Sequence, residues 1–255
     1  MTVKRDKIVK FCEEYLKVKD FKDSCVNGLQ VEGKEDIRKI VTGVSFSRDL
    51  INEAIKRKAD MIMVHHGIFK EVIPTLPKID GPIRERLRLL LTANINLCGF
   101  HLPLDAHPEI GNNISLIKDF GLKMTGGIDT PDYGAIGYLG EFNKPMDFKK
   151  FVILVNDKLK TRSYVISAGP KKVKKVGIIS GGAATDFKEA YRLGADTYLC
   201  GDIHEFLYHD IRETGINFIN AGHYNTEKLG IQNLGNLIAK KFKVEVEFVD
   251  IPCDV

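Results

Sequence analysis

Histidine residues follow a predicted strand in a pattern that suits metal binding. His65 and His66 come directly after the apolar run 61–64, and Gly67 allows the chain to turn there. Imidazole binds divalent metals, and α/β sheets place ligands at the carboxyl ends of parallel strands. Adjacent side chains of a regular strand point to opposite faces. We therefore expect both rings to serve one cavity only if the chain leaves the strand at this point.

Two further pairs repeat the pattern of a histidine and, four residues on, a carboxylate. His101 precedes Asp105, and Pro103 between them disfavours a regular helix, so we expect a loop that folds back. His223 and Glu227 open the predicted final helix, where a spacing of four places both side chains on one face. Three strand ends are thus predicted to bring these residues together.

The predicted ligands are nitrogen and oxygen atoms without thiolate. This combination favours a hydrolytic or Lewis-acid site for zinc, iron, manganese or a similar ion over structural zinc. Two related pairs indicate two metal ions, since a carboxylate can bridge ions about 3.5 to 4 Å apart and acidify a water between them. The alternative is that these residues are hydrogen-bonded polar groups at strand ends.

Short apolar runs alternate with amphipathic stretches, which predicts an α/β fold with mainly parallel sheets. The strands are expected at 40–44, 60–64, 95–100, 176–180, 197–200 and 216–220. The helices are expected at 48–58, 83–92, 114–120, 186–193, 208–213 and 227–242, with a further surface helix within 1–18.

The predicted elements fall into two similar passages, which indicates an internal duplication. Each passage has a strand, a helix, a strand after an Ala-Asp pair, a second helix, and a third strand followed by a histidine and carboxylate pair. We predict a first α/β half at 1–125 and a second at 126–255. One alternative lets the C-terminal helix pack on the first half.

Composition narrows the class of protein. The 255 residues are 44% hydrophobic and 28% charged, which excludes wholesale disorder. Five scattered cysteines without a C-x-x-C pair argue against a disulfide framework and favour a reducing cytoplasm. No apolar run reaches the roughly 18 residues of a membrane span, so no membrane partner is expected.

The small net charge of +4 is unevenly distributed. The segment 141–175 holds ten basic and three acidic residues, a net charge of +7, which leaves −3 for the rest of the chain. Such a segment is either a solvated face or a surface for phosphate groups.

Several motifs together resemble one family, the dinuclear-metal-centre proteins named GTP cyclohydrolase 1 type 2 homologs. The resemblance runs nearly from end to end. The motifs are Asn27-Gly28-Leu29-Gln30-Val31, Val64-His65-His66-Gly67, His101-x-x-x-Asp105 followed by Gly111-Asn112-Asn113, and Gly222-His223-x-x-x-Glu227.

The resemblance implies a duplicated α/β fold that assembles into a toroidal homohexamer with a dinuclear metal site. By motif matching it implies that the ligands of two divalent ions are His65, His66, Asp105, His223 and Glu227. Glu227 is the implied bridge and catalytic carboxylate, and His101 is carried over as a catalytic or auxiliary group in the pocket.

Two departures from the family pattern stand out. Cys25-Val26 occupies the place where many relatives have Trp-Asp. The passage 134–140 reads GAIGYLG where many relatives have Gly-x-Gly-Arg-x-Gly, which puts an anion contact by that arginine in doubt.

Two other segments lie at predicted strand ends of the second half. Ser180-Gly181-Gly182 is expected to form a tight turn, with phosphate binding by its N–H groups as the alternative. Asp202 and His204 hold the place that His65 and His66 hold in the first half. They are expected to line the pocket as acid, base or supporting groups, or to form an ordinary hydrogen-bonded pair.

Three functions are consistent with these observations. The first is a metal-dependent hydrolase with two divalent ions, acting on a nucleotide-like or phosphorylated small molecule. The second is a hexameric ring that binds DNA or other nucleic acid without sequence preference, a steeply salt-sensitive interaction. The third is a metal-binding scaffold without catalysis. The candidate contacts to nucleic acid are Lys171, Lys172, Lys174 and Lys175.

Overall fold

The computed structural model describes residues 2–69, 78–132 and 134–253, so only Met1 of the expected N-terminal helix lies outside it. The chain divides into two compact units. The first unit comprises Met1–Leu104 and Ile231–Ile251, and the second comprises Asp105–Gly230 and Pro252–Val255. Two helices begin in one unit and end in the other, α4 (Leu102–Ala106) and α9 (His223–Phe242).

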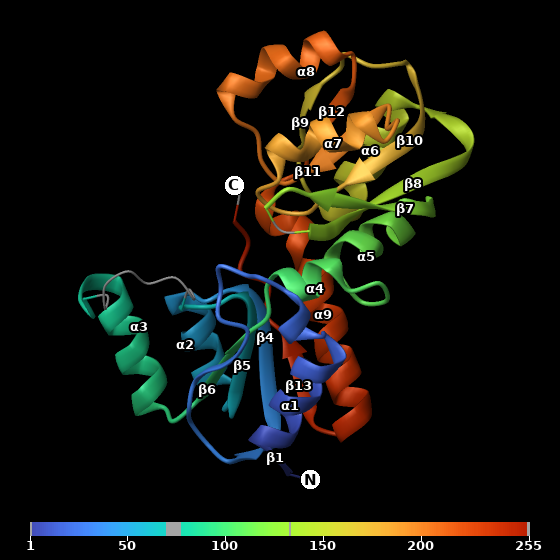
Figure 1. The fold of residues 1–255 in the computed structure, drawn as a ribbon. Helices are drawn as coiled ribbons and strands as arrows, with labels where there is room; N and C mark the ends of the chain where they lie inside the picture. The colour runs from blue at the N-terminus through green and yellow to red at the C-terminus, as the bar shows by residue number, and fades with distance from the viewer. Residues whose placement is uncertain (1, 70–77, 133, 254–255) are drawn as a thin grey trace. The chain divides into compact units, whose positions relative to one another are not determined.

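The first unit is built on a five-stranded sheet with the order β13-β4-β5-β6-β2, in which only β2 is antiparallel to its neighbour (Figure 1). The strands of the sheet are β2 (Gly28–Val31), β4 (Lys39–Ser45), β5 (Met61–His66), β6 (Asn96–Gly99) and β13 (Glu245–Phe248). Two further strands of the unit, β1 (Val3–Lys4) and β3 (Asp36–Ile37), form a separate antiparallel pair. Its other helices are α1 (Arg5–Tyr15), η1 (Val18–Asp20), α2 (Arg48–Lys56) and α3 (Gly81–Thr92).

Helices cover both faces of this sheet because its strands are apolar on both faces. Leu50 and Ile51 of α2 pack with Val41 and Ile62 of the sheet in one buried cluster. On the other face α9 approaches β4 closely at Gly235, where a Cβ atom would lie 3.2 Å from Thr42 Cγ2. The C-terminal part of α9 therefore belongs to the first unit, the arrangement that the sequence left open.

The second unit holds a six-stranded sheet with the order β7-β8-β10-β11-β12-β9. Its strands are β7 (Lys123–Thr130), β8 (Gly134–Asp147), β9 (Tyr164–Ile166), β10 (Lys172–Ile178), β11 (Thr197–Cys200) and β12 (Asn217–Asn220). Its helices are α5 (Asn112–Asp119), α6 (Phe148–Leu159), η2 (Ala184–Asp186), α7 (Phe187–Arg192), η3 (Glu205–Leu207) and α8 (Tyr208–Thr214).

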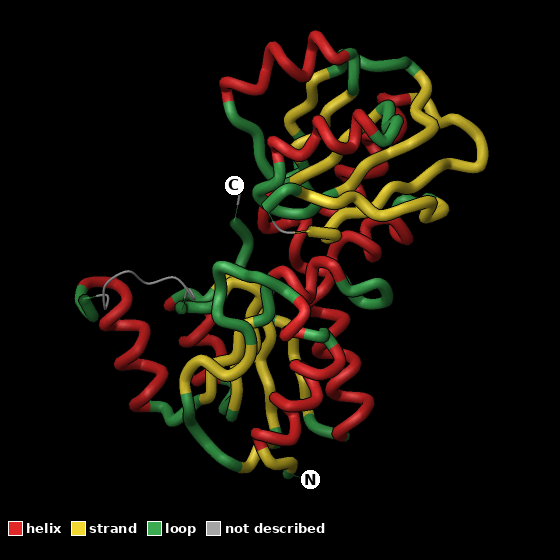
Figure 2. The backbone as a smooth tube through the Cα atoms, in the orientation of Figure 1, coloured by secondary structure: helices red, strands yellow, loops and turns green. Residues whose placement is uncertain are grey.

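This second sheet is mixed, so the prediction of mainly parallel sheets is wrong here. Only β10, β11 and β12 run parallel, whereas β7, β8 and β9 are paired antiparallel to their neighbours. The three antiparallel strands lie between residues 123 and 166, where neither a strand nor a helix was predicted. Figure 2 shows these strands in yellow beside the parallel ones.

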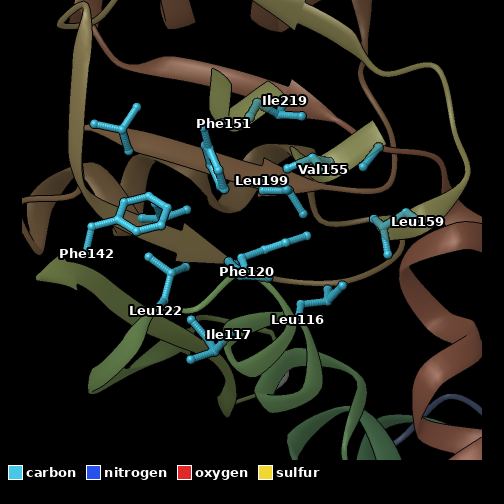
Figure 3. Packing of buried hydrophobic residues seen from close by; sticks show 14 of the residues in the cluster. Leu116, Ile117, Phe120, Leu122, Phe142, Phe151, Val155, Leu159, Leu199 and Ile219 are labelled. Atoms are coloured by element: carbon cyan, nitrogen blue, oxygen red, sulfur yellow. The ribbon is translucent and has the colours of Figure 1, made fainter. Parts of the chain in front are cut away.

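The core of the second unit explains why residues after 104 join it rather than the predicted first half. Leu116 and Ile117 of α5 and Phe151 of α6 are buried in one cluster with Leu199 and Ile219 of the sheet (Figure 3). The predicted boundary near residue 125 would separate α5 from this core. The contacts instead divide the chain at Leu104 and Asp105.

An aspartate plays the same part in each unit. Asp60, just before β5, accepts hydrogen bonds through Oδ2 from the backbone N–H groups of Arg38 and Lys39 at 2.9 and 3.1 Å. Asp196, just before β11, likewise accepts two at Oδ2, from successive N–H groups of β10 at 2.7 and 3.0 Å. The repeated Ala-Asp pairs of the sequence thus tie the first parallel strand to the second in both units.

An asparagine and a glycine also correspond between the units. Asn96 Oδ1 accepts a hydrogen bond from Gly33 N at 2.8 Å, and Asn217 Oδ1 accepts one from Gly169 N at 2.9 Å. A Cβ atom on either glycine would lie within 2.7 Å of the backbone beside the asparagine. These repeated contacts support the predicted duplication.

Asp60 offers a test of this shared arrangement through pH. Burial raises the pKa of the Asp60 carboxyl, but hydrogen bonds from the Lys34 ammonium and two backbone N–H groups outweigh it and hold the pKa below 3.8. We expect Asp60→Asn to lower the free energy of unfolding at pH 7 by about 1–3 kcal/mol. Because the folded-state pKa is lowered, the wild-type advantage is complete above the unfolded value and shrinks as the pH falls below it.

The measurement is denaturant unfolding of both chains between pH 7 and pH 3. Asp129→Asn is the control, since Asp129 is an exposed residue of β7. A difference between wild type and Asp60→Asn that stays constant down to pH 3 would contradict the role given to the charged carboxylate.

None of the described helices combines the length and hydrophobicity needed to cross a bilayer.

Candidate metal centre

His65 and His66 lie together at the carboxyl end of β5 in the first unit. Their ring centroids are 4.7 Å apart. The strand runs through His66, so the expectation that the chain must leave the strand first is wrong. Ser45 Oγ lies 3.0 Å from His66 Nδ1 and Phe100 O lies 2.9 Å from His65 Nδ1, so these contacts orient the rings while the backbone stays extended.

The contact at His65 decides which ring nitrogen is available to a metal. A carbonyl oxygen only accepts hydrogen bonds, so His65 Nδ1 carries the proton that is donated to Phe100 O. In the neutral ring, Nε2 then keeps its lone pair. A hydrogen bond of this kind fixes the tautomer of histidine ligands in metal sites.

His101 is the third histidine of this group. Its ring centroid lies 5.1 Å from that of His65 and 5.6 Å from that of His66. The expected loop after His101 is a short helix, α4, because Pro103 lies in the first turn, where its missing N–H costs nothing. One ligand atom from each of the three histidines lies within 4.8 Å of the other two, so this group can hold a metal ion.

Asp23 positions His101, and the sequence analysis did not single it out. Its Oδ1 lies 2.8 Å from His101 Nδ1, so the carboxylate accepts a hydrogen bond from the ring and fixes its orientation. Its Oδ2 accepts hydrogen bonds from Asn27 Nδ2 at 2.9 Å and from Leu102 N at 3.0 Å. Burial raises the pKa of Asp23, but these hydrogen bonds, led by that of His101, hold it below the usual value.

The motif at 27–31 supports the histidines directly. Asn27 Oδ1 accepts a hydrogen bond from His101 N at 2.7 Å. Gln30 Oε1 accepts one from Ile68 N at 2.7 Å, and a Cβ atom on Gly67 or Gly99 would overlap the Gln30 amide. The glycine after the histidine pair is therefore needed for close packing against Gln30.

A second group in the first unit overlaps the first. Asp23, Cys25 and His101 also bring one ligand atom each within 4.8 Å of one another. A hydrogen bond with His101 lowers the pKa of the Cys25 thiol, against the effect of burial. Cys25 is the residue at which this chain departs from the Trp-Asp of many relatives, so a thiol stands beside the auxiliary histidine.

Asp105 is held by two side chains of the second unit. Its Oδ1 accepts hydrogen bonds from Asn112 Nδ2 at 2.8 Å and from Ser180 Oγ at 3.0 Å. Ser180 N in turn donates to Asn113 Oδ1 at 2.6 Å. The Gly-Asn-Asn motif and the serine of the predicted turn thus fix Oδ1 of this carboxylate.

His223 and Glu227 share one face of α9, as predicted. His223 Nε2 lies 3.1 Å from Glu227 Oε2, and the Glu227 side chain is buried. Gly181 has a φ of +67°, and a Cβ atom there would overlap Glu227 Oε1. The turn at 180–182 therefore makes room for the glutamate, and no phosphate site is needed to explain it.

Asp202 and His204 form a pair in the same unit. His204 Nε2 lies 3.4 Å from Asp202 Oδ2, and Asp202 Oδ1 accepts a hydrogen bond from Ala184 N at 3.0 Å. Burial raises the pKa of Asp202 against the opposing effect of His204. The His204 ring also stacks on Phe206, with centroids 5.5 Å apart and planes 5° from parallel.

Tyr138 lies in the passage 134–140, where this chain departs from the family pattern. Its hydroxyl donates a hydrogen bond to Ala106 O at 2.8 Å, directly after Asp105 in the chain. Burial raises the pKa of Tyr138. The Tyr138 hydroxyl therefore holds the backbone next to Asp105, a candidate ligand.

The four candidate lysines for nucleic acid differ in their surroundings. Lys171 and Lys172 are exposed. The Lys174 ammonium donates to Phe142 O, and the Lys175 ammonium donates to Leu193 O at 2.7 Å. The side chains of Lys174 and Lys175 thus also bind backbone carbonyl groups within the unit.

Comparisons with known proteins give consistent results. A model of the family described as Duf34/NIF3 (NGG1p interacting factor 3) matches residues 3–254. A Pseudomonas aeruginosa protein named GTP cyclohydrolase 1 type 2 homolog is 37% identical over 252 residues, 99% of either chain. A Pyrococcus horikoshii protein of the same name is 39% identical over 250 residues, 97% of this chain and 98% of its own.

Two solved structures are similar over almost their whole length. The protein ybgI, described as of unknown function, matches with a TM-score of 0.93 at 36% identity over 99% of this chain and 100% of its own. A Thermus thermophilus protein matches with a TM-score of 0.88 at 30% identity, with the same coverage.

Proposed function

The chain belongs to the Duf34/NIF3 family, and on this premise we propose that it is a metal-dependent hydrolase with a dinuclear centre. The proposed substrate is a nucleotide-like or phosphorylated small molecule. Relatives bear the name GTP cyclohydrolase 1 type 2 homolog, which fits a nucleotide. The observation that carries the proposal is that one ligand atom from each of His65, His66 and His101 lies within 4.8 Å of the other two.

The proposed ligands of two divalent ions come from both units. His65 and His66 of the first unit, and Asp105, His223 and Glu227 of the second, supply the donor atoms. The support for combining them is the order of motifs along the chain. Imidazole and carboxylate donors fit iron, zinc or manganese. His101 is proposed as an auxiliary group held by Asp23.

The side chains of the protein have distinct tasks in this proposal. When bound, divalent ions lower the pKa of a water molecule so that it can act as a nucleophile near neutral pH. Glu227 would hold the metal ions through its carboxylate, and Gly181 keeps the space that this carboxylate needs. Asp202 and His204, 3.4 Å apart, are placed to exchange a proton between Oδ2 and Nε2 during the reaction.

The experiment is a hydrolysis screen over nucleotides and phosphoesters with the purified chain. We expect turnover of at least one phosphorylated compound, loss of that turnover after chelation, and recovery when a divalent ion is restored. Turnover that persists after complete metal removal would contradict the proposal. Bound metal without turnover of any compound would favour the non-catalytic scaffold.

Three further expectations stay predictions. A toroidal homohexamer is tested by the mass of the protein in solution. Binding of DNA through the segment 141–175 is tested by affinity at two salt concentrations, and absence of binding at low salt would reject it. A cytoplasmic location is tested by fractionation of cells.

A further inference from the structure

A cavity of about 730 Å³ lies in the second unit beside one of the candidate metal ligands. One wall is formed by Asp202 and His223, after β11 and at the start of α9. The lining also includes Arg162 and Tyr164, which follow α6 and begin β9. The cavity is large enough for a small-molecule substrate.

The cationic side chains of the lining are those of Lys160 and Arg162. Arg162 is exposed and forms no ion pair with any side chain in the described part of the molecule. Lys160 also lines the cavity, but its ammonium pairs with Asp157 at 3.0 Å. Arg162 is therefore the cation with its five donors free for a ligand.

Polar and aromatic side chains near Arg162 also line the cavity. Tyr164 is 50% exposed and pairs across the sheet with Asn220, which also lines the cavity. Asn220 Oδ1 accepts a hydrogen bond from Gly222 N at 2.9 Å, so its Nδ2 is left to donate to a ligand. An exposed phenol ring offers a stacking surface for a planar group.

We propose that Arg162 binds the phosphate group of the substrate while Tyr164 stacks on its ring, so that the reacting part lies toward His223. The inference rests on the proposed function, because it places the substrate relative to a proposed metal ligand. The guanidinium fork matches phosphate geometry, whereas Asp202 of the same lining repels a phosphate and so sets the orientation. Part of the +7 charge of the segment 141–175 thereby has a role in substrate binding.

The test compares inosine 5′-monophosphate with inosine, which differ only by the phosphate, as calorimetric probes of the purified chain. We expect the monophosphate to bind about tenfold or more tightly than inosine. Arg162→Gln is expected to remove about that factor for the monophosphate and to leave inosine binding unchanged. Tyr164→Ala is expected to weaken both probes alike.

Lys172→Gln is the matched control, because it removes the same charge from the same segment at an exposed residue that does not line the cavity. Equal affinity of the wild type for both probes, or equal effects of Arg162→Gln and Lys172→Gln, would overturn the inference. Metal content is measured on the same samples. A wild type without metal rejects the proposed hydrolase, whereas the comparison of the probes still decides on Arg162.

Discussion

Glu227→Ala is expected to lose stoichiometric metal and all hydrolytic activity. Glu227 is 3% exposed, and its Oε2 lies 3.1 Å from His223 Nε2, so the carboxylate is held beside a second candidate ligand. Removing a proposed bridging ligand weakens both metal positions at once. The measurement is metal content per chain together with turnover of a substrate from the hydrolysis screen.

Glu213→Ala is the control for this variant. Glu213 is an exposed glutamate of α8 in the same unit, so the change in net charge is the same. We expect its metal content and turnover to equal those of the wild type. Full turnover by a metal-free Glu227→Ala chain would show that the proposed centre is not the site of catalysis.

Gly181→Ala is expected to reduce both stability and metal binding, although it adds a single methyl group. Gly181 has a φ of +67°, a conformation that costs an L side chain about 1–2 kcal/mol. The added Cβ atom would also overlap Glu227 Oε1 and lie 3.1 Å from His223 Nε2. Mutation of a residue that positions a metal ligand typically lowers metal affinity by about 10–100-fold.

Gly182→Ala provides a matched comparison one residue away. A Cβ atom on Gly182 would lie 3.4 Å from His223 Cε1 and 3.5 Å from Asp202 Oδ2, which are ordinary contacts. We expect this variant to keep its metal. Denaturant unfolding and competition with a chelator measure the two effects. Equal behaviour of the two alanine variants would reject the packing role given to Gly181.

The parallel strands of both units could be predicted from the sequence. The runs around Val41, Ile62, Val176 and Leu199 are apolar on both faces, and buried parallel strands have this composition. The histidine and carboxylate residues could be predicted as site residues because they follow the ends of these strands. Helix α9 begins at His223, four residues before the predicted start at 227, and it places His223 and Glu227 on one face as their spacing predicted.

The antiparallel strands β7 and β8 could not be predicted in the same way. Their burial alternates only in part, and Gly126, Gly127, Gly137 and Gly140 interrupt the side-chain pattern. Helix α6 carried a usable signal, since Phe148, Phe151, Val155 and Leu159 recur at helical spacing and are buried.

Asp23 illustrates what local sequence leaves open. It lies in a stretch with serine and asparagine before β2, where an aspartate is ordinary, and its partner His101 lies 78 residues further along the chain. Its place before the motif at 27–31 was the only available sign. Similarly, Gly181 reads as a turn residue until the position of Glu227 is known.

Metal analysis of the purified wild-type chain beside a His65→Ala, His66→Ala double variant tests the central claim most directly. We predict two divalent ions per wild-type chain and a loss of stoichiometric metal in the double variant, with the fold retained. A wild-type chain without stoichiometric metal, or a double variant that keeps both ions, would contradict it.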